Sequence, residues 1–368
     1  MQYQARLPIL IFASVPPPVH GQNVMVAGML EALGKDPRFE VFHVDPGLSR
    51  RTEQVGRPEV GKVFRLLRAC SRAILLRLRK GPLLFYYIPS PARGTPLVRD
   101  LLVMLLCRPF FSRRVFHWHA VGLGWWARRR QSRFLGWITR RLLGRAELSI
   151  VLGPEVLEDA ASLKPRRVIV VPNGIPDPCP DFRPRHGGKH TPFEVLFLGT
   201  GSHDKGLFRA IAAIKAANSR RPGAFRLTFA GDFATARIEE EFRAAEDGSG
   251  GALRCAGFVS GAAKADLLAG SDLLCFPTSY AHEGQPLVLL EAMAFDLPIV
   301  TSRWRTIPSM LPSGHAWTVD LSNPSELVEA LLAAADAPPP MGALRGHFLQ
   351  HFTHERHLQR LTEALLSP

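Results

Sequence analysis

Residues 282–298 read HEGQPLVLLEAMAFDLP and place two glutamates, Glu283 and Glu291, eight positions apart. Pro286 suits the first position of a helix, where the N–H that proline lacks is not needed. Such a helix carries Glu291 in its second turn and leaves Glu283 in the preceding loop. Side chains in a helix lean toward its N-terminus, so both carboxylates can face one space, where free N–H groups suit a phosphate or a sugar hydroxyl. The alternative is a buried helix with one solvated glutamate, although a carboxylate inside an apolar run needs polar partners.

On both sides of this stretch, apolar runs rich in Val, Ile and Leu alternate with helical patterns. Strands are expected at 7–14, 39–45, 83–89, 114–120, 148–153, 167–175, 193–200, 225–232, 252–260, 272–279 and 297–302. Helices are expected between them, and 325–335 and 354–366 are expected to close the chain. This alternation predicts an α/β fold with parallel, doubly wound sheets.

A segment rich in Pro, Gly and charge, 172–192, interrupts the alternation. It predicts a boundary between two domains, residues 1–172 and residues 173–351, with the C-terminal helix of about 352–368 packing back on the first. A chain of 368 residues is long enough for two domains.

Several classes of protein do not fit the composition. The five cysteines are widely and irregularly spaced, with no CxxC pair, which indicates a reducing compartment and no zinc site. No stretch of 18 apolar residues is present, so a membrane-spanning helix is not expected. The short apolar run near the N-terminus is flanked too weakly for a signal peptide and is interpreted as a buried strand.

The net charge of +14 is unevenly spread. Residues 1–172 hold 28 Lys/Arg and 11 Asp/Glu, a balance of +17, whereas residues 173–368 hold 18 and 21, a balance of −3. Residues 62–80 form a basic amphipathic pattern, and tryptophans alternate with arginines in 122–146. These features favour an anionic membrane surface, while a solvated basic face is the alternative. A nucleic-acid partner is not expected, because no recognition motif accompanies the charge.

Two further stretches carry polar groups at expected strand ends. In RVFHWHA (114–120), His117 and His119 share one face of a strand, at the end where ligands bind in open α/β sheets; two structural histidines are the alternative. In GTGSHDKG (199–206), glycines permit tight turns and Lys205 supplies a charge at a helix start. This loop suits a diphosphate but lacks the Walker A spacing, and an ordinary surface loop is the alternative.

The order FLG…KG, FAGD, GFVS, DLLCFPTS and HEGQPLVLLEAMA resembles glycosyltransferase family 4 over the C-terminal half of the chain. PPPVHGQ, FHWHA and PNGI extend the resemblance into the first half, and the first of these with EGQPLVLLEAM is similar to bacterial exopolysaccharide and lipopolysaccharide transferases. The resemblance implies the GT-B fold, with two Rossmann-like domains facing a cleft.

It also implies residue roles. Glu283 matches a glutamate beside the reacting sugar, and His119 matches a histidine that contacts the donor sugar, so both are candidate catalytic residues. Glu291 matches the residue that binds the ribose of the nucleotide, and Lys205 matches a cation on the diphosphate. The remaining expected donor-binding residues are Gly21, Gly199, Thr200, Gly206, Gly284, Gln285, Pro286 and Leu287.

The chain departs from the family pattern at two positions. Thr200 stands where the family usually has an arginine, so one of two cationic phosphate contacts is missing. Asp296 stands where glycine is usual at the end of the helix, and aspartate tolerates the left-handed conformation better than most residues.

The function that the resemblance implies is a retaining hexosyltransferase for cell-surface polysaccharide. Its donor is a nucleotide-diphosphate sugar and its acceptor a glycan or lipid-linked molecule. No metal or other cofactor is expected, because Lys205 and helix N-termini can stabilise the leaving diphosphate and no DxD motif occurs in the donor region. Glu283 is assigned to stabilise the oxocarbenium-like state, with a nucleophilic role as the alternative.

The expected location is the cytoplasm, peripheral on the inner face of the cytoplasmic membrane. Two other functions suit the same fold. One is a nucleotide-sugar epimerase or hydrolase, and the other is a non-catalytic nucleotide-sugar-binding scaffold.

Overall fold

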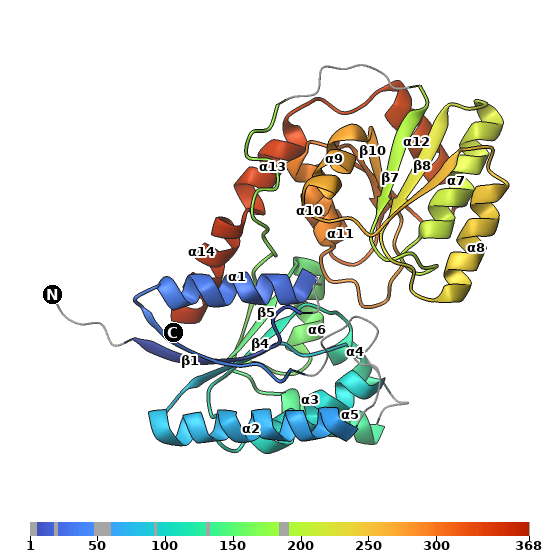
Figure 1. Cartoon of the computed structure of the whole chain (residues 1–368). Coiled ribbons are helices and arrows are strands. Elements are labelled where there is room, and N and C mark those ends of the chain that lie inside the picture. Colours follow the sequence, from blue (N-terminus) through green and yellow to red (C-terminus); the bar gives the residue numbers. More distant parts are fainter. Residues whose placement is uncertain are drawn as a thin grey trace. The chain divides into compact units, whose positions relative to one another are not determined.

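The computed structural model describes residues 6–17, 21–47, 60–91, 94–129, 133–183 and 191–367. The chain forms two compact units. The N-terminal unit comprises Met1–Asn173 and His357–Pro368, and the C-terminal unit comprises Gly174–Arg356. Within the described ranges each unit contains a six-stranded parallel sheet flanked by helices, which confirms the predicted pair of Rossmann-like domains (Figure 1).

The sheet of the N-terminal unit has the strand order β2-β1-β3-β4-β5-β6. Its strands are β1 (Leu7–Phe12), β2 (Phe39–Val44), β3 (Leu84–Tyr87), β4 (Arg114–Trp118), β5 (Leu148–Val151) and β6 (Arg167–Val170). Both faces of β1 are covered: Leu10 and Phe12 pack into one buried cluster, while Ile9 and Ile11 pack into another. Burial on both faces explains why this strand is a continuous apolar run rather than an alternating one.

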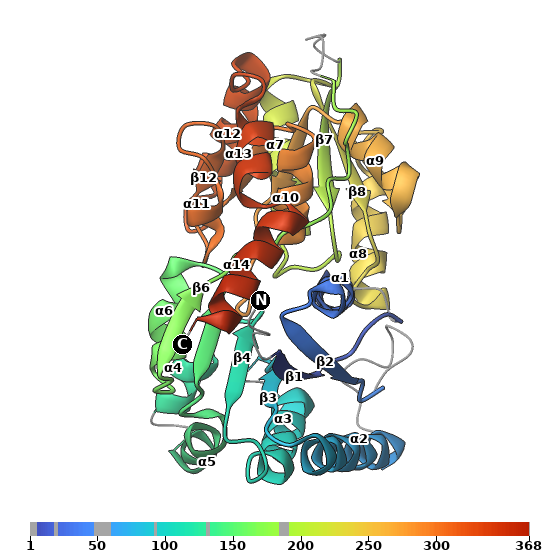
Figure 2. The same cartoon turned by 90° about the vertical axis from the view of Figure 1, so that its left-hand side faces the viewer.

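Helices cover the two faces of this sheet unequally. They are α1 (Gly21–Lys35), α2 (Val60–Lys80), α3 (Gly94–Cys107), α4 (Leu123–Arg128), α5 (Arg133–Leu143), η3 (Pro154–Val156), α6 (Leu157–Ala161) and α14 (His354–Leu366). Side chains of α1 and of the end of α14 pack on one face, and side chains of α2, α3, α5 and α6 pack on the other (Figure 2). The C-terminal residues therefore complete the core of the unit in which the chain begins.

The sheet of the C-terminal unit has the order β12-β11-β10-β7-β8-β9. Its strands are β7 (Phe193–Leu198), β8 (Phe225–Ala230), β9 (Leu253–Gly257), β10 (Leu273–Phe276), β11 (Ile299–Ser302) and β12 (Trp317–Val319). Its helices are α7 (Leu207–Arg220), α8 (Ala236–Asp247), α9 (Gly261–Gly270), α10 (Leu287–Ala294), α11 (Ile307–Met310), α12 (Pro324–Asp336) and α13 (Ala343–His351). Periodicity did not predict β12, α11 or α13, because the first two are very short and ALRGHFLQH lacks a clear apolar stripe.

Ten of the eleven predicted strands end one to five residues earlier in the structure than the apolar runs predict, and β11 ends at Ser302 as predicted. The run 272–279, for example, continues past Phe276, where the strand ends, so Thr278 and Ser279 lie in the following loop. Apolar residues near a buried crevice resemble strand residues even where the ladder has ended. These loops carry the candidate site.

Asp296 has a positive φ of 50°, which confirms the left-handed conformation expected after α10. Its carboxylate also accepts hydrogen bonds from the backbone N–H groups of Gly342, at 2.5 Å, and Arg345, at 3.1 Å. Aspartate at this position therefore caps the start of α13, which glycine could not do.

None of the described helices is both long enough and apolar enough to span a membrane.

Candidate functional site

In the C-terminal sheet, the direction in which the chain adds successive strands reverses between β7 and β10. From β7 the chain continues through β8 to β9 on one side, and from β10 it continues through β11 to β12 on the other. In open α/β sheets, ligands bind beyond the carboxyl ends of the strands at such a switch point, because the two following loops diverge and leave a crevice. The loop after β7 contains Lys205, and the loop after β10 contains Glu283.

The loop after β7 depends on glycine. Gly199 and Gly206 have φ values of 138° and 91°, and Gly206 is the N-cap of α7. A Cβ on Gly206 would lie 2.1 Å from the carbonyl oxygen of Pro277 in the other loop. Glycine is therefore required at this position both for the backbone conformation and for the close contact between the two loops.

The two loops are also joined by hydrogen bonds. The backbone N–H of Ser279 donates to the carbonyl oxygen of Asp204 at 2.7 Å. On the β11 side, the Ser302 hydroxyl donates to the carbonyl oxygen of Thr278 at 2.5 Å, and the Thr306 hydroxyl donates to that of Gly284. The backbone around the crevice is thus held from both sides, and two of the donors, Ser302 and Thr306, lie outside the motifs quoted from the sequence.

Lys205 and Glu283 meet at this crevice. The distance from Lys205 Nζ to Glu283 Oε2 is 2.7 Å, and the hydroxyl of Thr278 donates to the same oxygen at 3.1 Å. Glu283 is only 7% exposed, so its carboxylate is compensated by a cation and a hydroxyl, as a buried carboxylate requires. The lysine ammonium also lies 4.7 Å from the ring centroid of Tyr280, within cation–π range.

Glu291 lies in the second turn of α10, as predicted, but has its own cation. Its Oε1 lies 2.6 Å from Nζ of Lys264, which lies in α9, the helix that follows β9. Sequence reasoning missed Lys264, since its only signal is a position near the start of a helix. The structure therefore pairs each glutamate of the 282–298 stretch with a different lysine.

The other predicted donor-binding residues of this unit lie along the same loops. Pro286 is the N-cap of α10, in extended conformation, and Leu287 is the first helical residue, so the prediction that proline occupies the first helical position is wrong by one residue. Gly284 and Gln285 are buried beside Glu283 in the chain. Thr200 is exposed where the loop leaves β7, so the position at which the family usually has an arginine is open to solvent.

In the N-terminal unit, His117 and His119 lie at the carboxyl end of β4, with ring centroids 4.3 Å apart. His117 is buried, and its Nδ1 shares a hydrogen bond with the hydroxyl of Tyr86 on β3. His357 of α14 also stacks on His117, with ring centroids 6.1 Å apart. Tyr86 and His357, which sequence reasoning did not identify, complete this cluster from a neighbouring strand and from the far end of the chain.

Burial decides the charge of these histidines. It lowers the pKa of His119 to about 3, with a smaller contribution from nearby His357. Burial, followed by the proximity of His119 and His357, also lowers the pKa of His117 well below its ordinary value. Both imidazoles are therefore neutral near pH 7, and His119 can act as a hydrogen-bonding group but not as a fixed cation.

Gly21 is the first residue of α1. The preceding residues 18–20 of the PPPVHGQ motif lie outside the described residues. α1 follows β1, and β1 and β3 form the switch point of the N-terminal sheet. The backbone of Gly21 therefore begins the helix at the corresponding place in this unit.

Among the described residues, no group of three or more His, Cys, Asp or Glu side chains is arranged to hold a metal ion.

Residues 192–336 match the family model described as "Glycosyl transferases group 1". The solved structures that resemble the chain include sucrose-phosphate synthase from Thermosynechococcus elongatus, with a TM-score of 0.71 at 18% identity, covering 98% of both chains. Anabaena HepE in complex with UDP and glucose has a TM-score of 0.69 at 15% identity and covers 98% of this chain and 99% of its own. The lipopolysaccharide outer core galactosyltransferase WaaB, in its apo form, has a TM-score of 0.69 at 13% identity, with coverage of 98% and 99%. A search of curated protein sequences finds no significant match.

Proposed function

We propose that this chain of GT-B fold, in which residues 192–336 match the glycosyl transferases group 1 model, is a glycosyltransferase that transfers a sugar from a nucleotide-diphosphate sugar to a glycan or lipid-linked acceptor. One observation carries this proposal. The switch point of the C-terminal sheet holds a buried carboxylate, Glu283, in an ion pair with Lys205. Residues 173–351 are assigned to the donor and residues 1–172 to the acceptor.

The chemistry of glycosyl transfer suits this pair. Bond breaking leaves positive charge on the anomeric carbon and negative charge on the departing diphosphate. Lys205 and the N-termini of α7 and α10 are the groups that would stabilise the diphosphate, since cations and free helical N–H groups favour developing negative charge. Glu283 would stabilise the oxocarbenium-like carbon. A donor diphosphate that attracts Lys205 would free one oxygen of Glu283 to face the sugar.

The other donor contacts are assigned in the same way. Glu291, oriented by Lys264, would bind the ribose hydroxyls, and neutral His119 would hydrogen-bond the donor sugar. The backbone of the two loops and of the start of α1 would line the donor. The residues assigned to this lining are Gly21, Gly199, Thr200, Gly206, Gly284, Gln285, Pro286 and Leu287.

The proposal extends to stereochemistry and setting. The transferred group is a hexose, configuration is retained, and the leaving phosphate takes the acceptor proton. No metal is needed, because Lys205 and the helix N-termini stabilise the leaving diphosphate. The acceptor belongs to bacterial cell-surface polysaccharide, such as lipopolysaccharide, and the enzyme works at the cytoplasmic face of the inner membrane. The similarity in fold to the lipopolysaccharide outer core galactosyltransferase WaaB supports this setting.

A panel of nucleotide sugars tests the proposal, with release of nucleoside diphosphate measured in the presence and absence of a membrane-extract acceptor. We expect Lys205→Ala and Glu283→Ala each to lower kcat by about 10²–10³-fold, the usual cost of removing one stabilising group. Arg221→Ala, which removes an exposed ion pair with Asp336, is the matched control and should turn over normally.

Several outcomes would contradict the proposal. Wild-type turnover in either variant would remove the assigned chemistry. Donor consumption that ignores the acceptor would indicate a hydrolase or epimerase, and donor binding without consumption would indicate a scaffold. NMR of the anomeric configuration of the product tests whether configuration is retained. Treatment with a chelator tests metal independence, and we expect it to leave the activity unchanged.

A further inference from the structure

Helix α2 has two apolar stripes on opposite sides. Leu66, Cys70 and Ala73 are buried against the sheet of the N-terminal unit. A second stripe faces solvent and consists of Phe64, Leu67, Leu75 and Leu78. The last three lie three, eleven and fourteen residues after Phe64. Phe64 is 71% exposed and Leu78 64%. With 3.6 residues per turn these positions share a face, so α2 presents a second apolar surface that the described chain does not cover.

The two neighbouring helices extend this surface. α2 packs beside α3, and α3 packs beside α5, along the same face of the sheet (Figures 1 and 2). Val98 and Leu105 of α3 are exposed, seven positions apart. On α5, Phe134 and Trp137 are 76% and 56% exposed. Each of the three helices thus buries one side and shows apolar side chains on the other.

The same region is basic almost without exception. Residues 60–146 contain 19 Lys/Arg and a single acidic residue, Asp100, which is fully buried and bonded to Tyr87 and Ser90. The exposed apolar side chains are therefore accompanied only by positive charge. A surface that served solubility alone would not need large apolar side chains at its centre.

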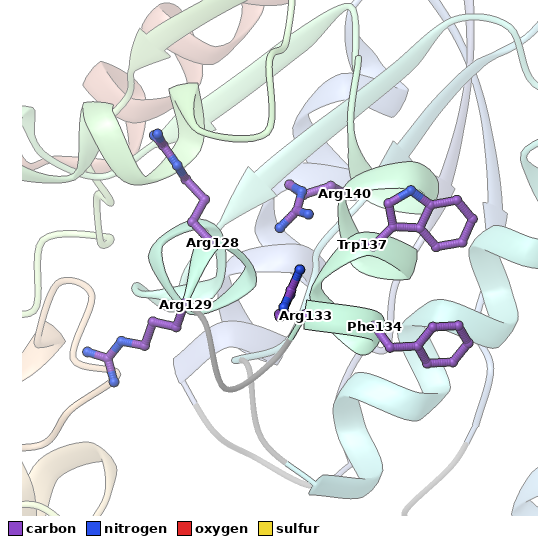
Figure 3. Close-up of a pocket in the computed structure, with 6 residues that line it drawn as sticks. All are labelled: Arg128, Arg129, Arg133, Phe134, Trp137 and Arg140. Atoms are coloured by element: carbon purple, nitrogen blue, oxygen red, sulfur yellow. The ribbon is translucent and has the colours of Figure 1, made fainter.

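A pocket between α4 and α5 shows the arrangement at close range (Figure 3). Arg133 and Arg140 lie on the side of α5 that faces α4, while Phe134 and Trp137 project together from the other side. Arg128, the last residue of α4, and Arg129, which follows it, complete the lining. Cations thus lie beside a pair of exposed aromatic rings, an arrangement typical of the boundary between lipid headgroups and acyl chains.

We propose that the outer face of α2, α3 and α5 is the docking surface for an anionic phospholipid bilayer. The apolar stripes enter the interface in the plane of the membrane, and the arginines of α2, α4 and α5 bind lipid phosphates. Charge complementarity selects this occupant, since each basic residue near an anionic surface adds attraction that a neutral surface lacks. The inference identifies the site of the membrane association assumed in the proposed function, but vesicle binding requires neither donor nor acceptor and is tested separately.

Flotation of the full chain with vesicles tests the proposal. We expect binding to vesicles of phosphatidylcholine with 30% phosphatidylglycerol, at least tenfold weaker binding to phosphatidylcholine alone, and weakening by salt. The double variant Phe64→Glu/Trp137→Glu should reduce binding at least tenfold. Phe258→Glu, at a 62% exposed phenylalanine of the C-terminal unit, is the matched control and should bind as the wild type does.

A second measurement guards against misfolding of the charged variant. Bromine-labelled acyl chains should quench part of the tryptophan fluorescence of the wild type and less in Trp137→Phe, whose vesicle binding should remain within threefold. Full binding by the double variant, or equal loss in Phe258→Glu, would overturn the proposal. Two other results would also overturn it, because the face would then bind another partner. One is a dimer in solution that dissociates in the double variant, and the other is binding to duplex DNA that the double variant weakens as much as it weakens vesicle binding.

Discussion

The two units build the same kind of parallel sheet but equip its carboxyl edge with different chemistry. In the C-terminal unit, each glutamate of the 282–298 stretch is paired with a lysine, Glu283 with Lys205 and Glu291 with Lys264. In the N-terminal unit, the corresponding edge holds the neutral histidines His117 and His119. The excess positive charge of that unit comes from lysines and arginines, 19 of which lie within residues 60–146, and not from these two histidines.

This difference indicates how the work is divided. A lysine in an ion pair with a carboxylate suits a charged diphosphate. When the diphosphate binds, it takes the place of the carboxylate beside the same lysine. Neutral imidazoles suit sugar hydroxyls, which need hydrogen bonds and not net charge. Surface arginines suit a membrane, because they act over a wide area without a defined pocket.

The largest effect is expected where the two loops of the C-terminal unit touch. In Gly206→Ala the new Cβ meets the Pro277 carbonyl at 2.1 Å, so the loop carrying Lys205 must move away from Glu283. A displacement of about 1 Å lowers kcat by roughly 10²-fold, and overpacking with a positive φ costs about 3 kcal/mol of unfolding free energy. Steady-state kinetics and urea unfolding measure both effects.

Gly223→Ala is the matched control for this loop. Its φ of 72° is also positive, but nothing lies within 4 Å of the new Cβ. We expect a loss of about 1 kcal/mol without a change in kcat. If the two variants behave alike, contact between the loops does not position the ion pair.

The second lysine separates binding from chemistry. Lys264→Ala removes the cation that orients Glu291, and should raise KM for the donor about tenfold while leaving kcat unchanged. Lys215→Ala, at an exposed position of α7, is the control and should match the wild type. An equal fall in kcat would place Lys264 among the groups that act in the transition state.

Acid should distinguish the N-terminal unit. His119 has a folded pKa of about 3 against an ordinary value of 6.5, so the unfolded chain binds a proton that the folded chain does not. Stability from this residue is therefore complete above pH 6.5 and is lost as the pH falls toward 3, at up to about 1.4 kcal/mol per pH unit.

Urea titrations at pH 6.5 and pH 5.5 measure how much unfolding free energy each protein loses between these two values. The loss in His119→Gln should be smaller than the loss in the wild type by about 1 kcal/mol. His315→Gln, at a partly exposed position of the C-terminal unit, should retain the wild-type dependence. Equal slopes in the wild type and His119→Gln would show that burial does not keep this imidazole neutral.

The smallest effect is expected at Thr200. Thr200→Arg adds a cation at the exposed exit of β7, and should lower KM for the donor by about threefold through a charge-assisted hydrogen bond. Ser219→Arg, on the exposed end of α7, adds the same charge away from the loop and should leave KM unchanged. A donor affinity unaffected by Thr200→Arg would mean that the diphosphate is held from another direction.

Local pattern was sufficient for the elements and for part of the site. The apolar runs and the loop glycines predict both sheets. The resemblance assigns Lys205 and Glu283 to the same donor, and in the structure these side chains lie 2.7 Å apart. Short elements such as β12 escaped prediction because three residues carry no period. Lys264 and His357 escaped prediction because neither lies in a motif. Only the packing of α9 and α14 brings Lys264 to Glu291 and His357 to His117.

The sequence by itself determined the fold class, the residues that follow each buried strand and the unequal charge of the two halves, because these depend on local pattern and composition. Only the tertiary structure decided which lysine faces which glutamate, which imidazoles are neutral and which helix faces remain uncovered. Those properties depend on burial and on distances between residues remote in the chain, and neither quantity is written in a local stretch of sequence. The stretch 282–298 by itself identifies both glutamates as candidate site residues, but strand order and helix packing determine which lysine each of them contacts.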